Sequence, residues 1–410
     1  MTKEKSTVPR LRFPGFTDAW KQRKLGEVLK ERNESRSPSA DVPLVSFTVE
    51  NGVTPKTERY NREFLVRDEN KKYKFTQLDD IVYNPANLKF GAIARNKYGA
   101  AVFSPIYVTY GVLSEAHPLF VELIVTSTNF IQRALRYQEG TVYERMAVKS
   151  FDLLRSEILL PALPEQEAIG NFFSDLDQLI TLHQRKLDDV KELKKALLQK
   201  MFPKGNGNDF PELRFPEFTD AWKQRKLGEV SKRVTRRNKE LISSLPLTIS
   251  AQHGLVDQEE FFNKQVASKD VSSYYLIKKG EFAYNKSYSN GYPWGAIKRL
   301  DRYEMGVLST LYIVFKPTSL ICSDYLVSYY DTVNWYKEVS MIAAEGARNH
   351  GLLNIAPNDF FKTRLFIPTL PEQEAIGSFF SDLDQLITLH QRQLDHLKLL
   401  KKALLQQMFI

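Results

Sequence analysis

The chain has 410 residues, enough for two or three domains, and its 42% hydrophobic and 12% aromatic content excludes global disorder. A formal net charge of +9 favours a polyanionic partner, because neutralising each phosphate releases condensed counterions. The single cysteine, Cys322, excludes a disulfide framework, and neither a secretory signal nor a run of about 18 apolar residues occurs, so we expect a cytoplasmic protein without membrane spans.

Two segments of the sequence occur twice. Residues 11–28, LRFPGFTDAWKQRKLGEV, return as residues 213–230 with a single change, Gly15 to Glu217. Residues 163–202 return as residues 370–409 with six changes in 40. The chain is therefore built from two tandem halves, and the Pro- and Gly-containing residues 203–209 predict a linker between them.

Each half carries a variable region between its two repeated segments. β-branched and aromatic residues predict strands at 103–110, 159–160 and 307–315, and helical patterns appear at 120–137 and 325–339. Short strands with a few helices predict an α+β fold. The markers Tyr83-Asn84 and Gly91-Ala92-Ile93 return as Tyr284-Asn285 and Gly295-Ala296-Ile297, which indicates one fold used twice. Plain duplication with drift is the alternative, but drift should erode the repeated segments as well.

The long repeated segments predict two helices. Pro164 and the carboxylates beside it suit a helix N-terminus, and a continuous helix over 171–202 would be roughly 48 Å long. Its apolar stripe needs a partner, and the simplest one is the other copy, in an antiparallel coiled coil with pseudo-twofold symmetry. His183 and His390 on this seam are either a register-fixing pair or tolerated polar residues. The predicted helix-pairing residues are Phe172, Leu176, Leu179, Val190, Leu197, Phe379, Leu383, Leu386, Leu397 and Leu404.

The positive charge lies outside the long segments. Each long segment carries a net charge of −1, so the rest of the chain carries +11. Basic and aromatic residues alternate in both variable regions, where Lys and Arg can hold phosphates and Arg, Asn and Gln can read purine edges. A solvated basic surface is the plainer alternative. The candidate DNA-binding residues are Lys72, Lys74, Asn87, Lys89, Tyr143, Arg145, Lys286, Tyr288, Asn290, Tyr292, Arg348, Asn349 and His350.

Motifs of a self-sufficient enzyme are missing from the sequence. It contains no GxxxxGK[ST], HExxH or GxSxG, and its six histidines and one cysteine form no obvious metal site. The run Asn84-Pro85-Ala86 is similar to the start of an amino-methyltransferase motif but lacks the second proline and the aromatic residue. We therefore predict no catalytic and no metal-binding residues in this chain.

This organisation resembles the specificity (S) subunits of type I restriction-modification systems. The resemblance rests on two repeated motifs, Trp-x-x-x-x-Leu-Gly-Glu at residues 20–27 and 222–229, and Leu-Pro-Glu-Gln-Glu at residues 163–167 and 370–374. The resemblance implies target-recognition domains at 1–162 and 210–369, helical spacers at 163–202 and 370–410, and the linker at 203–209. We refer to the two recognition domains as domain 1 and domain 2.

The resemblance also implies a function. Each domain would read one half of a bipartite, asymmetric double-stranded DNA target, and the helices would fix the spacing between the half-sites. Two modification (methyltransferase) subunits and restriction (translocase/nuclease) subunits would dock. This chain would bind no cofactor, and S-adenosylmethionine, ATP and Mg²⁺ would belong to the partner subunits.

Two other functions compete with this one. A stand-alone DNA-binding regulator explains the charge and the duplication, but not why the helices stayed so similar. A complete methyltransferase-nuclease would have to methylate DNA as an isolated chain.

Overall fold

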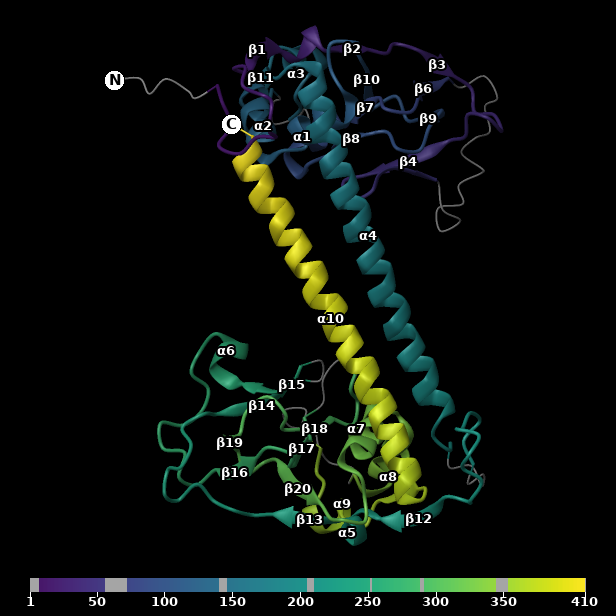
Figure 1. Ribbon diagram of the computed structural model, residues 1–410, viewed down its shortest axis with the longest axis vertical. Coiled ribbons are helices and arrows are strands. Elements are labelled where there is room, and N and C mark those ends of the chain that lie inside the picture. The colour runs from purple at the N-terminus through teal and green to yellow at the C-terminus, as the bar shows by residue number, and fades with distance from the viewer. Residues whose placement is uncertain are drawn as a thin grey trace. The chain divides into compact units, whose positions relative to one another are not determined.

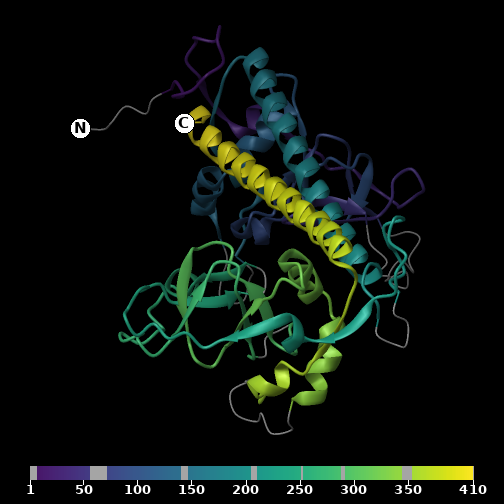
Figure 2. The same ribbon diagram turned by 60° about the horizontal axis from the view of Figure 1, so that its bottom comes forward.

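The computed structural model describes residues 7–55, 72–139, 146–204, 210–250, 253–287, 291–343 and 353–409. It contains two compact units, residues 1–183 with 393–410 and residues 184–392. The unit boundaries fall inside the two long helices, α4 (Leu163–Lys200) and α10 (Leu370–Met408). Figures 1 and 2 trace each helix without a break, α4 in teal and α10 in yellow. No helix in the described ranges is long and apolar enough to span a bilayer.

Domain 1 is built around an antiparallel sheet of strand order β2-β10-β7-β8. Its strands are Leu29–Glu31, Val108–Val112, Ile81–Tyr83 and Ile93–Arg95. The smaller sheets pair β3-β6-β9 (Ser35–Arg36, Tyr73–Thr76, Ala101–Phe103), β4-β5 (Val45–Thr48, Gly52–Pro55) and β1-β11 (Lys21–Lys24, Glu157–Leu160). The helices are η1 (Leu25–Glu27), η4 (Pro85–Phe90), α1 (Pro118–Val125), α2 (Thr128–Ala134), η5 (Leu135–Tyr137) and α3 (Ser150–Leu154).

Domain 2 repeats this arrangement. Its central antiparallel sheet has the order β13-β20-β17-β18, with strands Ser231–Val234, Ile313–Pro317, Phe282–Asn285 and Ala296–Arg299. The pairs are β12-β21 (Lys223–Lys226, Arg364–Ile367), β14-β15 (Leu247–Ser250, Gly254–Asp257) and β16-β19 (Tyr275–Lys278, Met305–Leu308). The helices are α5 (Leu227–Val230), α6 (Gln258–Phe262), α7 (Ser323–Asp331), α8 (Asn334–Ile342) and α9 (Pro357–Phe360).

Some predicted elements are split in two. The strand predicted at 103–110 is the end of β9 and the start of β10, separated by a turn in which Tyr107 N donates to Ser104 O at 3.2 Å. The strand predicted at 307–315 divides between β19 and β20 at the equivalent turn, where Tyr312 N donates to Ser309 O at 3.1 Å. The apolar residues of these runs belong to paired strands on either side of a tight turn.

The predicted helices at 120–137 and 325–339 are also divided. Ser127 ends the first run and caps α2, because its hydroxyl accepts from Phe130 N at 3.2 Å. In the second, Asn334 N donates to the Thr332 hydroxyl at 3.2 Å, and α8 begins there. A hydroxyl that satisfies the free amides of a new helix turn favours a break between two helices. The strand expected at 159–160 is confirmed as part of β11.

Each long helix begins against a short helix of the preceding domain, at a glycine. A Cβ on Gly170 of α4 would lie 2.8 Å from the Cβ of Leu119, and one on Gly377 of α10 would lie 2.7 Å from the backbone nitrogen of Tyr325. Only glycine allows this approach, since it has no side chain. The close contact therefore fixes where each helix crosses its domain.

A buried carboxylate fixes the start of α4 to the repeated N-terminal segment. Glu165 is 1% exposed and accepts two hydrogen bonds from the Arg12 guanidinium at 2.6 and 2.7 Å, and one from Trp20 Nε1 at 3.4 Å. Arg12 also donates to Asp18 O at 2.6 Å. The hydrogen bond to Glu165 raises the pKa of Arg12. We call this group the Arg–Glu–Trp clamp.

The second unit holds the same clamp at the start of α10. Glu372 is fully buried and accepts from Arg214 at 2.7 Å through each oxygen and from Trp222 Nε1 at 3.2 Å. Two bonds from one planar guanidinium define direction as well as distance. The clamp therefore sets the orientation in which each helix leaves its domain.

The C-terminal end of α10 completes the core of domain 1. The ring of Phe409 lies 5.9 Å from Trp20, 5.5 Å from Phe120 and 6.3 Å from Phe173, measured between centroids. Met408 before it is 3% exposed and belongs to the same core. Met408 and Phe409 are thus part of the core of domain 1.

The C-terminal end of α4 plays the equivalent part in the second unit. The ring of Phe202, 2% exposed, lies 6.1 Å from Trp222, 5.5 Å from Tyr325 and 6.2 Å from Phe380. Met201 is buried beside it. Each domain core is therefore completed by the helix that follows the other domain.

Within each unit the two long helices run antiparallel. In the first unit Asp177 of α4 binds Lys401 of α10 at 2.5 Å, and Phe173, earlier in α4, contacts Phe409, later in α10. In the second unit Lys194 binds Asp384 at 2.7 Å, while the later Phe202 contacts the earlier Phe380. The predicted α+β fold with two paired long helices is confirmed.

The predicted seam residues fall into four groups. Leu176 is buried, and Phe172, Leu397 and Leu404 pack against the first core, whereas Leu197, Phe379 and Leu383 pack against the second. Val190 is half-buried. Leu179 and Leu386 lie outside the seam, 40% and 38% exposed.

A heptad explains this correction. From Leu176 of α4, alternating steps of four and three residues lead to Ile180, His183, Leu187, Val190 and Lys194, all buried or half-buried. The seam therefore passes through Ile180 and turns Leu179 outward. His183 and His390 occupy seam positions and are half-buried.

Replacing Leu397 with Asp tests the seam of the first unit. We expect a loss of about 2–4 kcal/mol in the free energy of unfolding, because a charge enters an apolar contact. The control is Leu399→Asp, two residues further along α10, where the side chain is 66% exposed. Chemical denaturation measures both variants, and equal losses would contradict the seam.

Candidate nucleic-acid interface

The predicted DNA-binding residues that are described gather chiefly at one equivalent loop in each domain. In domain 1 the loop joins β7 to β8 through η4, and in domain 2 it joins β17 to β18. These are neighbouring strands of the central sheet in both domains. The central sheets of the two domains have the same strand arrangement, and each carries a loop of a different sequence at the same place. One fold that presents two different ligand surfaces requires such an arrangement.

Asn84 starts the first of these loops and has a structural role. It is 7% exposed, and its Oδ1 accepts from Ala86 N at 3.1 Å, which caps η4. Gly91 ends η4 with φ 84°, a left-handed conformation that glycine adopts without strain. The run Asn84-Pro85-Ala86 is accordingly accounted for as a helix start.

Asn87 and Lys89 lie on the exposed side of this loop, as a DNA-contacting role requires. Beside them is Phe90, which sequence reasoning missed and which is 64% exposed, with Lys89 Nζ 4.9 Å from its ring centroid. An exposed aromatic ring next to a cation can stack on a base while the cation meets a phosphate. The missed signal was the aromatic residue directly before the turn glycine.

The described residues of the domain 2 loop are less exposed than predicted. Lys286 is half-buried, its Nζ donates to Ile355 O at 3.3 Å, and its backbone oxygen accepts from Leu353 N at 2.9 Å. Burial lowers the pKa of Lys286. Tyr292 is half-buried as well. Lys286 thus braces the chain at 353–355 against the loop, and its DNA contact stays a prediction.

Lys72 and Lys74 lie in a different sheet, at β6. Lys72 is exposed directly before the strand. The side chain of Lys74 is 15% exposed, donates to Asn33 Oδ1 at 3.1 Å and lies 3.7 Å from Glu31. Part of its charge is therefore already satisfied within the domain. The predicted residues that fall outside the described residues are Tyr143, Arg145, Tyr288, Asn290, Arg348, Asn349 and His350.

A basic strand in each domain was also missed. The strands β1 and β12 have the same sequence, KQRK, and all four side chains are exposed in both. Arg23 and Arg225 pair with Glu27 and Glu229 at 3.0 and 3.6 Å. Lysine-rich edge strands also resist edge-to-edge aggregation. The signal was available as an identical charged run in both halves.

Two features of the described residues bear on the chemistry of these loops. In those ranges no three His, Cys, Asp or Glu side chains gather as metal ligands would. The loops offer amides, ammonium groups and aromatic rings, which suit phosphate and base contacts.

Comparison with known proteins identifies the fold. No protein-family model matches the chain. The crystal structure of the type I restriction-modification S subunit from M. genitalium superposes with a TM-score of 0.61 at 13% identity, covering 98% of this chain and 99% of that one. The HsdS subunit from Thermoanaerobacter tengcongensis gives 0.45 at 19% identity, with 100% and 99% covered. A chain from a structure of type I system assembly and conformational transition gives 0.46 at 17%, with 95% and 97% covered. The chain has the fold of a type I restriction-modification S subunit over nearly its whole length.

Proposed function

We propose that this chain is the non-catalytic DNA-specificity subunit of a type I restriction-modification complex. Domain 1 reads one half of a bipartite, asymmetric target and domain 2 reads the other. The observation that carries the proposal is that one sheet framework occurs twice with unrelated loops between β7 and β8 and between β17 and β18, joined by nearly identical helices. The similarity in fold to the S subunit of M. genitalium supports it.

The paired helices set the unread spacing between the half-sites. A helix of 38 residues, the length of α4, is about 57 Å long, which exceeds one turn of B-DNA, about 34 Å. The clamps and the buried helix ends hold each helix at a defined place in its domain. Such a helix can act as a ruler because neither end is free to slide.

The outer faces of the helices dock two modification subunits. Exposed leucines recur at repeat-related positions, and side chains that avoid burial within one chain are available to a partner. The equivalent pairs are Leu179 with Leu386, Leu182 with Leu389, and Leu193 with Leu400. Two copies of one surface suit two copies of one partner. Those subunits would bind S-adenosylmethionine and flip the target adenine, and restriction subunits would use ATP and Mg²⁺.

Methylation mapping tests the proposal. The chain is co-expressed with its modification subunit in a host without adenine methylation, and methylated adenines are located by single-molecule sequencing. We expect one bipartite motif with a fixed gap. An assembled complex that adds no methylation would contradict the proposal and favour a stand-alone DNA-binding protein.

Exchanging residues 231–362 for another variable region tests the two-module organisation. We expect one half-site to change and the other to remain, because the exchanged segment lies within domain 2. The reciprocal exchange of the region between the repeated segments of domain 1 is the matched control. A change in both half-sites from either exchange would contradict independent domains.

A further inference from the structure

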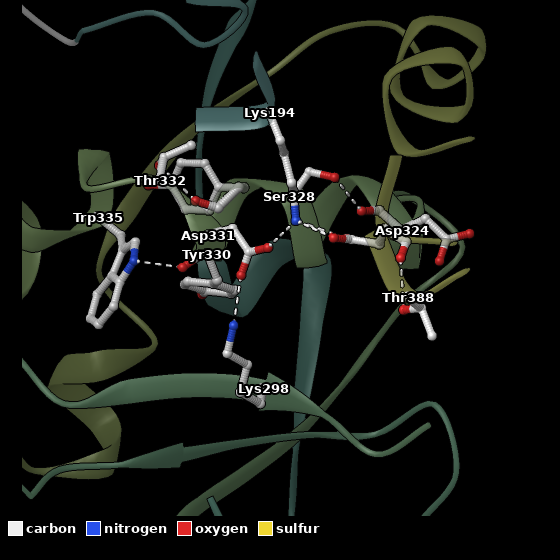
Figure 3. A network of polar contacts seen from close by, with 11 residues as sticks. Lys194, Lys298, Asp324, Ser328, Tyr330, Asp331, Thr332, Trp335 and Thr388 are labelled. Carbon is white, nitrogen blue, oxygen red and sulfur yellow. Dashed lines mark hydrogen bonds and ion pairs between the residues drawn. The ribbon is translucent and has the colours of Figure 1, made fainter. Parts of the chain in front are cut away.

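Lys194 occupies a seam position of α4 at which an apolar residue would be expected. It lies four residues after Val190 in the heptad, and its side chain is only 13% exposed. Its ammonium group binds both oxygens of Asp384 in α10, at 2.7 and 2.8 Å, and one oxygen of Asp331 at 2.9 Å. One lysine therefore connects both long helices to the last residue of α7. Figure 3 shows the bond between Lys194 and Asp331.

Asp331 extends this network into the central sheet of domain 2. Its other oxygen accepts from Lys298 Nζ, on β18, at 2.7 Å (Figure 3). Burial alone would raise the pKa of Asp331, but the charges of Lys298 and Lys194 outweigh it and lower the pKa. Burial likewise opposes the charge of Lys194, and Asp331 and Asp384 raise its pKa despite it. Two lysines and two aspartates form a network without net charge, in which the partners favour the charged forms of Lys194 and Asp331.

The first unit keeps only half of this network. Lys401, the repeat of Lys194, binds Asp177, the repeat of Asp384, at 2.5 Å. Gln166 of α4 accepts a hydrogen bond from the backbone nitrogen of His117, directly before α1, at 2.9 Å. Its repeat Gln373 of α10 accepts the same bond from Cys322, directly before α7, also at 2.9 Å. Helix α1 is therefore the equivalent of α7.

That match identifies the missing half. Directly after the last residue of α1, Thr126 takes the place of Asp331. In the sheet, Tyr83 opposes Ile93 as Tyr284 opposes Ile297, so Ala94 takes the place of Lys298. Neither Thr126 nor Ala94 carries a charge. Both domains hold a long helix through an Arg–Glu–Trp clamp, but among the described residues only domain 2 adds ion pairs from α7 and β18 at this position.

We infer that Lys194 is a positioning residue that orients domain 2 on the helix pair, so that selectivity at the second half-site depends on it. A buried ion pair adds little net stability over an apolar pair of similar shape. Its directional bonds do, however, define one arrangement of α4, α10, α7 and β18. Domain 1 has its clamp but no charged residue in the places of Asp331 and Lys298. The inference rests on the proposed function.

The test compares Lys194→Met with the matched control Lys401→Met in the full chain with its modification subunits. Methionine keeps the unbranched stem, and Asp331 retains Lys298, so we expect the protein to fold. Methylation mapping should show Lys194→Met accepting mismatched bases about tenfold more often at the second half-site, with the first unchanged. Lys401→Met should leave both half-sites as in the wild type. Unchanged selectivity in Lys194→Met, or equal effects of both variants, would overturn the inference.

Hydrogen exchange on the chain alone separates this inference from the proposed function. We expect faster exchange in α7 and β18 for Lys194→Met and for Asp331→Asn, which keeps the side-chain shape. The equivalent α1 and β8 should be unaffected by Lys401→Met. If exchange changes as expected but the wild type methylates no bipartite motif, the proposed function fails and the positioning role stands. Unchanged exchange in both unit 2 variants would overturn the positioning role itself.

Discussion

Replacing Phe202 with Ala should abolish recognition of the second half-site while sparing the first, although Phe202 follows domain 1 in the sequence. Its ring lies among Trp222, Tyr325 and Phe380 in the core of the second unit. Truncating a fully buried phenylalanine leaves a cavity and costs about 3–5 kcal/mol, a large part of a domain's stability. We expect a clear fall in the melting temperature of the second unit.

The matched variant is Phe409→Ala, which should damage the first half-site. Phe409 contacts Trp20, Phe120 and Phe173 but is only half-buried, so we expect a smaller loss than for Phe202. Leu399→Ala, at a 66% exposed position of the same helix, should change neither half-site. Methylation maps of the three complexes, with thermal melts, measure the effects. If Phe202→Ala instead lost recognition of the first half-site, the end of α4 would not be supporting the domain whose core it enters, and the prediction would be wrong.

The repeated segments made the architecture predictable. Identical residues recurring at an offset of about half the chain indicated two copies of one fold, and the three-and-four spacing indicated long paired helices. The repeat and the helical spacing are each defined by many residues, so a wrong assignment of one residue does not change the predicted architecture. What the pattern did not show is that Phe202 and Phe409 complete the opposite domains, because most of their aromatic partners lie more than 100 residues away in sequence.

Local boundaries were harder to predict for a physical reason. At Ser104–Tyr107 the chain turns within an apolar run, and at Ser127 a hydroxyl restarts a helix. Both features depend on individual hydrogen bonds that a run of apolar residues does not encode. The exposure of Leu179 is similar, because the choice between it and Ile180 depends on one residue of helical phase.

The candidate interface was predicted more coarsely than the fold. Composition indicated which regions carry Lys and Arg, but not which of these side chains form hydrogen bonds or ion pairs within their own domain. Lys74 is partly satisfied by Asn33, and Lys286 by a backbone oxygen, whereas Lys89 is exposed. Phe90 follows Lys89 in the alternating basic and aromatic pattern, but the pattern did not show that its ring is exposed.

Replacing Arg12 with Ala should destabilise the first unit by about 3 kcal/mol or more, because it leaves the carboxylate of Glu165 buried without its cation. Glu165 is 1% exposed, and only the weaker bond from Trp20, at 3.4 Å, would remain. The exposed pair of Arg23 and Glu27 is the control, since Arg23→Ala should alter the melting temperature little. Chemical denaturation of each variant gives the comparison.

A double substitution separates the charge from the shape of the clamp. Arg12→Met combined with Glu165→Met removes both charges and should recover most of the stability that Arg12→Met alone loses, because no unpaired charge stays buried. Recovery of stability need not restore function. If the bidentate bonds orient α4, the double variant should fold, yet accept targets whose half-site spacing differs from the wild type, and Arg12→Lys should fall between the two. A double variant with wild-type stability and an unchanged spacing would show that packing around Trp20 is enough to direct the helix.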